Sequence, residues 1–169
     1  MNEAADAPPV REAPYLIRPA TADDAAALAE IERVAFDPTT YGGFLMNARA
    51  FRRHAASSNI LLVAVANTPG GAVAGYALGF VKAGSPYVRF VSLAVGPEHG
   101  GRGAAWRLFA ALEQTAKERD LRGVRLEIRE DNHRLLARYR RQGYEVFATV
   151  PQYYSDGAAA IRMVKDLPA

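Results

Sequence analysis

The stretch HGGRGAA, residues His99–Ala105, decides how this chain is read. It places three glycines within four residues, and glycine is costly in the interior of a helix or a strand. An apolar run typical of a strand, 87–95, comes before it, and a helical pattern over 104–118 comes after it. The sequence therefore predicts a strand, a glycine loop and a helix start, whose free N–H groups suit an anion.

Two common phosphate-binding motifs do not fit this loop. A P-loop requires Gly-Lys-Ser/Thr at its end, whereas Gly103 is followed by Ala-Ala-Trp. A dinucleotide fingerprint belongs to a first strand–helix–strand unit, and this loop comes late in the chain. The loop alone leaves two readings open, a phosphate cradle and a plain connector between strand and helix.

Composition and charge set the protein class. The chain has 169 residues, of which 50% are hydrophobic and 23% are charged, as expected for one soluble domain. A net charge of +3 is too small to indicate nucleic-acid binding, but it is compatible with an anionic ligand. Without cysteine there is no disulfide framework, and the three histidines lack metal-ligand spacing. No apolar run approaches the roughly 20 residues of a membrane span, so we expect a cytoplasmic protein that binds neither metal nor membrane.

Periodicity gives an order of elements for a single domain over 15–169, after a loose tail over 1–14. The expected strands are 15–20, 60–66, 72–81, 87–95, 123–129, 145–150 and 158–167. The first expected helix starts at the cap Thr21 and ends before 37–43, and the second covers 44–56, with Phe44, Ala48 and Phe51 on one side. The third covers 104–118, and one of its faces carries Ala105, Leu108, Phe109, Leu112 and Ala116. The fourth covers 132–144.

This order predicts an α/β fold. The three strands between 60 and 95 follow one another through short turns, which favours an antiparallel meander. The strand–helix–strand unit over 87–129 implies a parallel pair. We expect a mixed, mostly antiparallel sheet with helices on both faces.

A second motif identifies a family. The segment LEIREDNHRLLARYRRQGY, residues 126–144, places Asn132, Tyr139, Gly143 and Tyr144 at fixed spacings. Together with LAVGPEHGGRGAA, residues 93–105, it resembles the GNAT superfamily of N-acetyltransferases, which carries both motifs in this order. The family fold has the predicted elements and a splayed parallel strand pair. Gly100 stands where the family usually has glutamine or arginine, which removes one side-chain contact to the cofactor.

The resemblance implies acetyl-CoA as co-substrate. The pantetheine arm of acetyl-CoA would pair with the strand backbone, and its pyrophosphate would lie in the glycine loop. Asn132 would form a hydrogen bond with the cofactor near a helix start. Tyr139 would also touch it and give a proton to the departing thiolate. The implied contacts on the strand and the loop are Leu93, Ala94, Val95, Gly100, Gly101, Arg102, Gly103, Ala104 and Ala105. From the residues alone, Tyr139 can equally be a core aromatic and Asn132 a simple helix cap.

Glu127 resembles the general base of the RimI-like branch, which acetylates the N-terminal alanine of a ribosomal protein. An α-amine with a pKa of about 7.8 is deprotonated at pH 7 for about 1 kcal/mol, whereas a lysine amine needs roughly 4–5 kcal/mol. One carboxylate therefore suits an α-amine. The alternative is a surface glutamate paired with Arg125 and Arg129, its same-face neighbours on the strand.

Several acceptors stay open. We expect the N-terminal α-amine of a peptide or protein, and the alternatives are a small amine such as a polyamine, amino acid or drug, or a non-catalytic acyl-CoA-binding module. Tyr153 and Tyr154 can line the acceptor cleft or pack a hairpin, and the segment 37–51 occupies the place of acceptor recognition. Arg134, Arg138 and Arg141 form a solvated stripe or help with cofactor phosphates. The protein can be a monomer or a homodimer.

Overall fold

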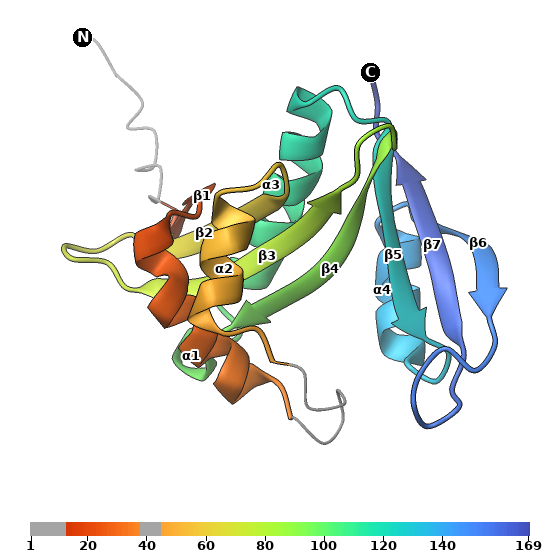
Figure 1. Cartoon of the computed structure of the whole chain (residues 1–169), viewed down its shortest axis with the longest axis horizontal. Helices are drawn as coiled ribbons and strands as arrows, with labels where there is room; N and C mark the ends of the chain where they lie inside the picture. Colours follow the sequence, from red (N-terminus) through yellow and green to blue (C-terminus); the bar gives the residue numbers. More distant parts are fainter. Residues whose placement is uncertain (1–12, 38–44) are drawn as a thin grey trace, which may run out of the picture.

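A computed structural model describes residues 13–37 and 45–169, and these build one seven-stranded sheet flanked by helices (Figure 1). The strands are β1 (Tyr15–Pro19), β2 (Ile60–Ala66), β3 (Val73–Val81), β4 (Tyr87–Val95), β5 (Gly123–Arg129), β6 (Glu145–Val150) and β7 (Ala160–Asp166). The helices are α1 (Ala25–Ala35), α2 (Ala48–Ala55), α3 (Ala104–Glu118) and α4 (His133–Arg141), with 3-10 turns at Ala22–Asp24 and Pro97–His99. The predicted fold class is confirmed.

The sheet has the strand order β1-β2-β3-β4-β5-β7-β6. Strands β1 to β4 pair antiparallel, as the short turns predict, and β5, β7 and β6 form a second antiparallel group. The two groups meet at β4 and β5, which are parallel because α3 carries the chain from one to the other. The junction between the groups is therefore the single parallel step of the described sheet.

Two apolar layers hold the helices against the sheet. Helices α1 and α2 cover one face, where Leu28, Phe51 and Tyr76 are buried, and α3 and α4 cover the other, where Leu108, Phe109 and Tyr139 are buried (Figure 1). On β5, Val124, Leu126 and Ile128 point into the α3 layer. The alternating residues of β5 therefore point to the opposite face, which carries α1 and α2 on the neighbouring strands.

The first two helices differ in detail from the prediction. The Thr21 cap is followed by a 3-10 turn, because the Asp24 side chain bonds back to the Thr21 backbone, and α1 begins only at Ala25. Helix α2 begins at Ala48, because the Asn47 side chain caps it by accepting from the Ala50 N–H. The expected contribution of Phe44 lies outside the described residues.

The other corrections are small. On α3 the buried residue of the first turn is Ala104, whereas Ala105 is half-buried. The helix expected over 132–144 is shorter, because Asn132 caps it and its last helical residue is Arg141. The tail expected over 1–14 lies almost wholly outside the described residues, as do 38–44 of the segment 37–51.

Candidate functional site

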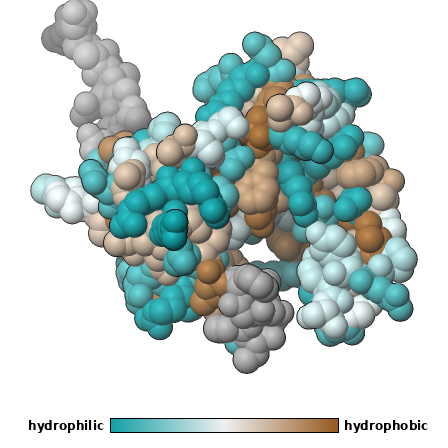
Figure 2. Space-filling view, viewed as in Figure 1, coloured by the Kyte–Doolittle hydropathy of each residue, from teal (hydrophilic) through white to brown (hydrophobic). Residues whose placement is uncertain are grey.

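The parallel strands β4 and β5 diverge after a short paired segment. They pair only from Tyr87–Arg89 to Gly123–Arg125, and both strands then run on separately. Leu93, Ala94 and Val95 still pair with β3 on one side, but no described strand pairs with them on the other. The face shown in Figure 2 is hollowed between the two halves of the sheet. The backbone of β4 is therefore open to an extended ligand along this slot.

The glycine loop lies at the open end of β4 and leads into α3. Gly101 and Gly103 have φ of 71° and 85°, a conformation that side chains with a Cβ rarely adopt, although a Cβ there would meet no atom within 4 Å. Gly103 is the N-cap of α3 and has no side chain to satisfy the first amides of the helix. The amides from Gly101 to the start of α3 are therefore available to an anion, whereas the Gly100 N–H already donates to the Pro97 carbonyl.

His99 anchors the loop to the rest of the sheet. Its Nδ1 lies 3.0 Å from the hydroxyl of Tyr15 on β1, and its ring packs edge-on against the Tyr15 ring. Its side chain is only 13% exposed. His99 therefore holds the start of the glycine loop against β1.

Tyr139 is positioned by the way α4 ends. Gly143 has a φ of 89° and its N–H donates to the carbonyl of Arg140, while the Tyr144 N–H donates to the carbonyl of Tyr139. This pair of bonds is a Schellman motif, and it brings the Tyr144 ring to 5.4 Å from the Tyr139 ring. Phe109 packs against both rings from α3. The sequence QGY therefore fixes Tyr139 as well as ending the helix.

The hydroxyl of Tyr139 is free to act on a ligand. The hydroxyls of Tyr76, Tyr87 and Tyr144 all donate to carboxylates, whereas that of Tyr139 has no hydrogen-bond partner in the described part of the chain. Burial raises the pKa of Tyr139 to about 12, with the charge of Arg138 lowering it and that of Glu113 raising it. The side chain is thus both a core aromatic and a protonated donor.

Asn132 is the N-cap of α4, which is one of the two roles that the sequence left open for it beside a cofactor contact. Its Oδ1 accepts from the Leu135 N–H at 3.1 Å. Its amide nitrogen makes no hydrogen bond within residues 13–37 and 45–169, and the side chain is exposed. The cap uses only the oxygen, so the nitrogen stays available to a ligand.

Glu127 lies on the face of β5 opposite Tyr139. Arg89 of β4 donates to its Oε2 at 3.1 Å, and Nε of Arg162 on β7 lies 3.4 Å from its Oε1. The carboxylate is only 15% exposed. The alternative in which Glu127 pairs with Arg125 and Arg129 is not observed: its partners are Arg89 and Arg162 on the two adjacent strands, which lie closer to it than its same-face neighbours on β5.

The two rejected partners have other contacts. Arg129 binds Asp131 and Asp156, and its hydrogen bonds to Asp156 lower the pKa of that carboxyl to about 2. The Arg125 guanidinium lies 4.1 Å from the ring centre of Tyr87 and 5.1 Å from that of Phe147. Neither arginine is therefore a partner that holds Glu127 in place.

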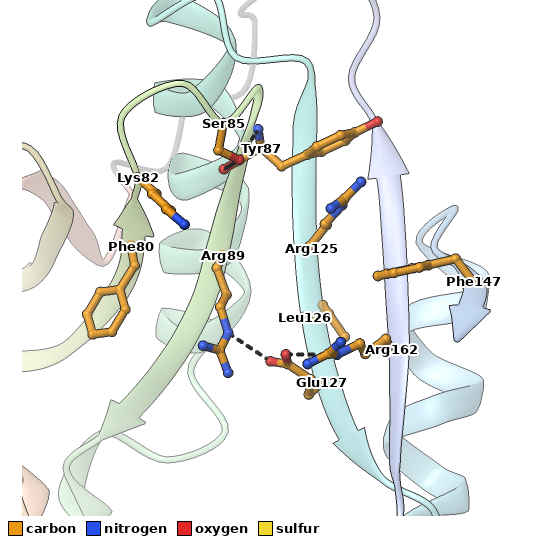
Figure 3. A pocket seen from close by; sticks show the side chains of 10 residues that line it. All are labelled: Phe80, Lys82, Ser85, Tyr87, Arg89, Arg125, Leu126, Glu127, Phe147 and Arg162. Carbon is orange, nitrogen blue, oxygen red and sulfur yellow. Dashed lines mark hydrogen bonds and ion pairs between the residues drawn. The ribbon is translucent and has the colours of Figure 1, made fainter. Parts of the chain in front are cut away.

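A cleft of about 380 Å³ opens beside Glu127 (Figure 3). Its walls come from β3, the β3–β4 turn, β4, β5, β6 and β7. Its lining residues are Phe80, Lys82, Ser85, Tyr87, Arg89, Arg125, Leu126, Glu127, Phe147 and Arg162. At its edge the Tyr153 hydroxyl accepts from Arg89 at 3.0 Å. The connection between β6 and β7 therefore reaches the site through Tyr153, while the Tyr154 ring packs over Arg129.

A buried network on the same side of the sheet escaped the sequence analysis. Glu32 on α1 is 4% exposed and accepts hydrogen bonds from the Tyr76 hydroxyl and the Met46 N–H. The Tyr76 hydroxyl also contacts Ser92 Oγ at 2.9 Å, and burial together with Glu32 raises the pKa of Tyr76. Only a glutamate at an otherwise buried position of the α1 stripe could have signalled it. The network joins the helix beside the segment 37–51 to the open half of β4.

The other sequence expectations concern exposed groups. Arg134, Arg138 and Arg141 are all exposed, as a solvated stripe requires. The described residues contain no cluster of three potential metal ligands. None of the helices in the described ranges is long and apolar enough to cross a membrane.

Comparisons with known proteins agree with this geometry. A model of the acetyltransferase (GNAT) family matches residues 25–144. An uncharacterized N-acetyltransferase of Methanocaldococcus jannaschii is 35% identical over 156 residues, which cover 90% of this chain and 92% of that protein. Among solved structures, the ribosomal-protein-S18-alanine N-acetyltransferase of Escherichia coli matches with a TM-score of 0.74 and 21% identity, over 92% of this chain and 95% of that one. The PaiA N-acetyltransferase of Thermoplasma acidophilum, in complex with coenzyme A, matches with a TM-score of 0.69 and 17% identity, over 90% and 99%. At these identities the two structures establish the fold alone.

Proposed function

The chain belongs to the GNAT family of N-acetyltransferases, and on that premise we propose that it acetylates the N-terminal α-amine of a peptide or protein. Glu127 is its general base and Tyr139 its general acid. One observation carries the proposal. These two side chains lie on opposite faces of β5, beside the slot where β4 and β5 separate, so that an acyl group in the slot is reached by a base from one face and an acid from the other.

Acetyl-CoA, the donor that the family uses, supplies the activated acetyl group. The residues present fit it. The amides at Gly101, Gly103 and the start of α3 suit its pyrophosphate, since this loop has no side-chain cap and has the backbone freedom that close approach requires. The free edge of β4 over 93–95 suits the amide groups of its pantetheine arm. Arg102 and the amide nitrogen of Asn132 add polar contacts at the two ends of this path.

Glu127 can take a proton although two arginines contact it. A carboxylate has about four lone-pair positions, and Arg89 and Arg162 each approach one oxygen, which leaves positions for an amine or a bridging water. Deprotonating an α-amine costs only about 1 kcal/mol at pH 7. The neutral amine nitrogen then forms the new C–N bond as the C–S bond breaks; one of its two protons passes to Glu127 and the other stays on the amide nitrogen.

Tyr139 serves the leaving thiolate as the C–S bond breaks. Its hydroxyl has no competing partner and stays protonated, because burial raises its pKa to about 12. A thiol has a pKa of about 8.5, so a complete proton transfer from this hydroxyl to the free thiolate is uphill by roughly 5 kcal/mol. The hydroxyl therefore acts as a hydrogen-bond donor to the sulfur, and the proton follows as negative charge develops there.

The alternatives are weaker on this geometry. A polyamine is cationic, and the cleft beside Glu127 is lined by lysine and arginine side chains that repel it. A non-catalytic acyl-CoA-binding module would have no use for a free hydroxyl at Tyr139 opposite a half-buried carboxylate.

Mass spectrometry after incubation with acetyl-CoA tests the proposal. The acceptors are peptides with a free N-terminus, N-blocked peptides that carry lysine, and small amines. We expect acetylation at free N-termini, and Glu127→Gln should slow it most at low pH, where the amine is protonated. Transfer only to small amines would refute the proposed acceptor. An unchanged pH–rate profile in Glu127→Gln would refute the base.

A further inference from the structure

The cleft beside Glu127 has an unbalanced charge. Lys82, Arg89, Arg125 and Arg162 line it, and Glu127 is the one carboxylate among its lining residues (Figure 3). Arg89 and Arg162 share that carboxylate, while Lys82 and Arg125 have no ion-pair partner in the described part of the chain. Lys82, Arg89 and Arg125 are exposed and Arg162 is half-buried, so the cleft presents an excess of positive charge to a ligand.

The arrangement costs the sheet stability. Arg89 and Arg125 occupy directly paired positions of β4 and β5, and like charges at paired positions destabilise a sheet. Arg162 adds a further mismatch, because its Nε is buried without a hydrogen bond of good geometry. An anion in the cleft would offset the repulsion between Arg89 and Arg125, although it could not reach the buried Nε of Arg162.

Arg125 is prepared to receive that anion. Tyr87 and Phe147 pack against its guanidinium at 4.1 Å and 5.1 Å, which limits its motion but leaves its N–H edges unbonded. Hydrogen bonds from the Tyr87 hydroxyl and from Arg122 lower the pKa of Asp166, and the charge of Arg125 adds to this effect without a direct bond. The planar donor edge of Arg125 therefore remains for a ligand carboxylate.

The spacing along β5 limits where the ligand carries its charge. Arg125 and Glu127 are two residues apart on the same face, a separation of about 7 Å. When the N-terminal amine of an extended peptide lies at Glu127, the side chain of its second residue therefore lies near Arg125. The α-carboxylate of a free amino acid is too close to its own amine to bridge this distance.

We propose that this enzyme prefers peptides whose second residue is acidic, with that side-chain carboxylate bound by Arg125 and Lys82. The inference rests on the proposed N-terminal acetylation. It adds the charge of the acceptor, which the family fold leaves open.

Three peptides test it. They begin Ala-Glu, Ala-Gln and Ala-Lys, are otherwise identical, and are amidated at the C-terminus so that the second side chain sets their charge difference. We expect kcat/KM for Ala-Glu to exceed that for Ala-Gln by about tenfold, the usual size of one charge-assisted contact, with Ala-Lys lowest.

Variants assign the preference to the cleft. Arg125→Gln should bring the Ala-Glu and Ala-Gln peptides to within about twofold, and Arg125→Glu should favour Ala-Lys. Lys117→Gln is the matched control, since it removes one exposed positive charge on α3, across the sheet, and should keep the full preference. Circular dichroism confirms that each variant is folded.

The outcomes separate the two proposals. Equal kcat/KM for the three peptides, or a preference for Ala-Glu that survives Arg125→Gln, would overturn the acidic acceptor and leave N-terminal acetylation standing. Acetylation of none of the three peptides by the wild-type enzyme would refute the proposed function, and the inference with it.

Discussion

The two faces of β5 are built in different ways. On one face Leu126 and Ile128 join an apolar layer with α3 and α4, and Tyr139 stands in it among other aromatic rings. On the other face Glu127 sits among arginines that arrive from β4 and β7. The first face is held by packing and the second by charge.

The difference lies in how far apart along the chain the contributing residues are. Tyr139 is fixed by Gly143 and Tyr144, a few positions away, through backbone bonds that one helix end dictates. Arg89 is 38 residues before Glu127, and Tyr153 is 64 residues after Arg89. A local sequence motif can therefore predict the apolar side around Tyr139, whereas the partners of Glu127 on the charged side are brought together only in the assembled sheet.

Removing the Tyr139 hydroxyl should have the largest effect and should separate chemistry from packing. In Tyr139→Phe the ring contacts remain and no hydrogen bond within the described residues is lost, so the Tm should stay within about 2 °C. Turnover should fall by about 100-fold, the lower range for a general acid. Thiol release gives kcat, and calorimetry gives acetyl-CoA affinity.

The control for this prediction is Tyr144→Phe, which removes a hydroxyl that bonds Glu113 instead. It should cost stability and leave most of the turnover. If Tyr139→Phe kept normal turnover while acetyl-CoA binding collapsed, the tyrosine would be a cofactor contact and the apolar face would have no acid.

Glu32→Gln tests how much the buried hydrogen bonds of Glu32, on the same side of the sheet as Glu127 but outside the cleft, contribute to stability. Glutamine offers one oxygen where Glu32 accepts from both Tyr76 and Met46, so one buried donor meets an NH₂ group. The loss should be about 1–3 kcal/mol of unfolding free energy. For a domain of this size that is a Tm decrease of roughly 2–10 °C by calorimetry.

A double mutant sharpens this result. Tyr76→Phe removes one of the two donors, so Glu32→Gln should cost less in that background than in the wild type. Strictly additive losses would mean that the carboxylate and the Tyr76 hydroxyl do not act as a unit.

The sequence predicted the strands, because alternation, glycine turns and caps are local signals, whereas the splayed parallel pair that makes the slot was implied by the family resemblance alone. Asn132 and Gly143 each mark a helix end through their own backbone needs. The partners of Glu127 could not be found in this way. Register decides that Arg162 faces it across β5 and β7, and strand periodicity alone points to Arg125 and Arg129. The buried Glu32–Tyr76 pair joins a helix to a strand 44 residues later, which no local pattern encodes.

Substitutions in the glycine loop should have a smaller effect, on thermal stability. In Gly103→Ala the new Cβ meets no atom within 4 Å, so the cost is the positive φ alone, about 1 kcal/mol. Gly100→Ala is the matched control, because Gly100 has a φ of −61° and its Cβ would make only ordinary contact with the Pro97 carbonyl. Calorimetry should show a Tm decrease of about 2–4 °C for the first and little change for the second. Equal losses would mean that space rather than backbone conformation requires these glycines.

The smallest predicted effect is a pH dependence on the side of α1 and α2. Burial lowers the pKa of His54, and the charge of Arg53 lowers it further, while the imidazole stacks on Phe80 and contacts Asn59. The unfolded chain binds a proton at a pKa of about 6.5, before the folded chain does. This contribution to stability is therefore complete above that pH and is lost as the pH falls through the lowered pKa of the folded state. Between pH 7.5 and 5.5 the Tm of the wild type should fall by about 1 °C more than that of His54→Gln. Parallel curves for the two proteins would show that His54 is as well solvated in the fold as in the unfolded chain, and that its stacking on Phe80 does not exclude water.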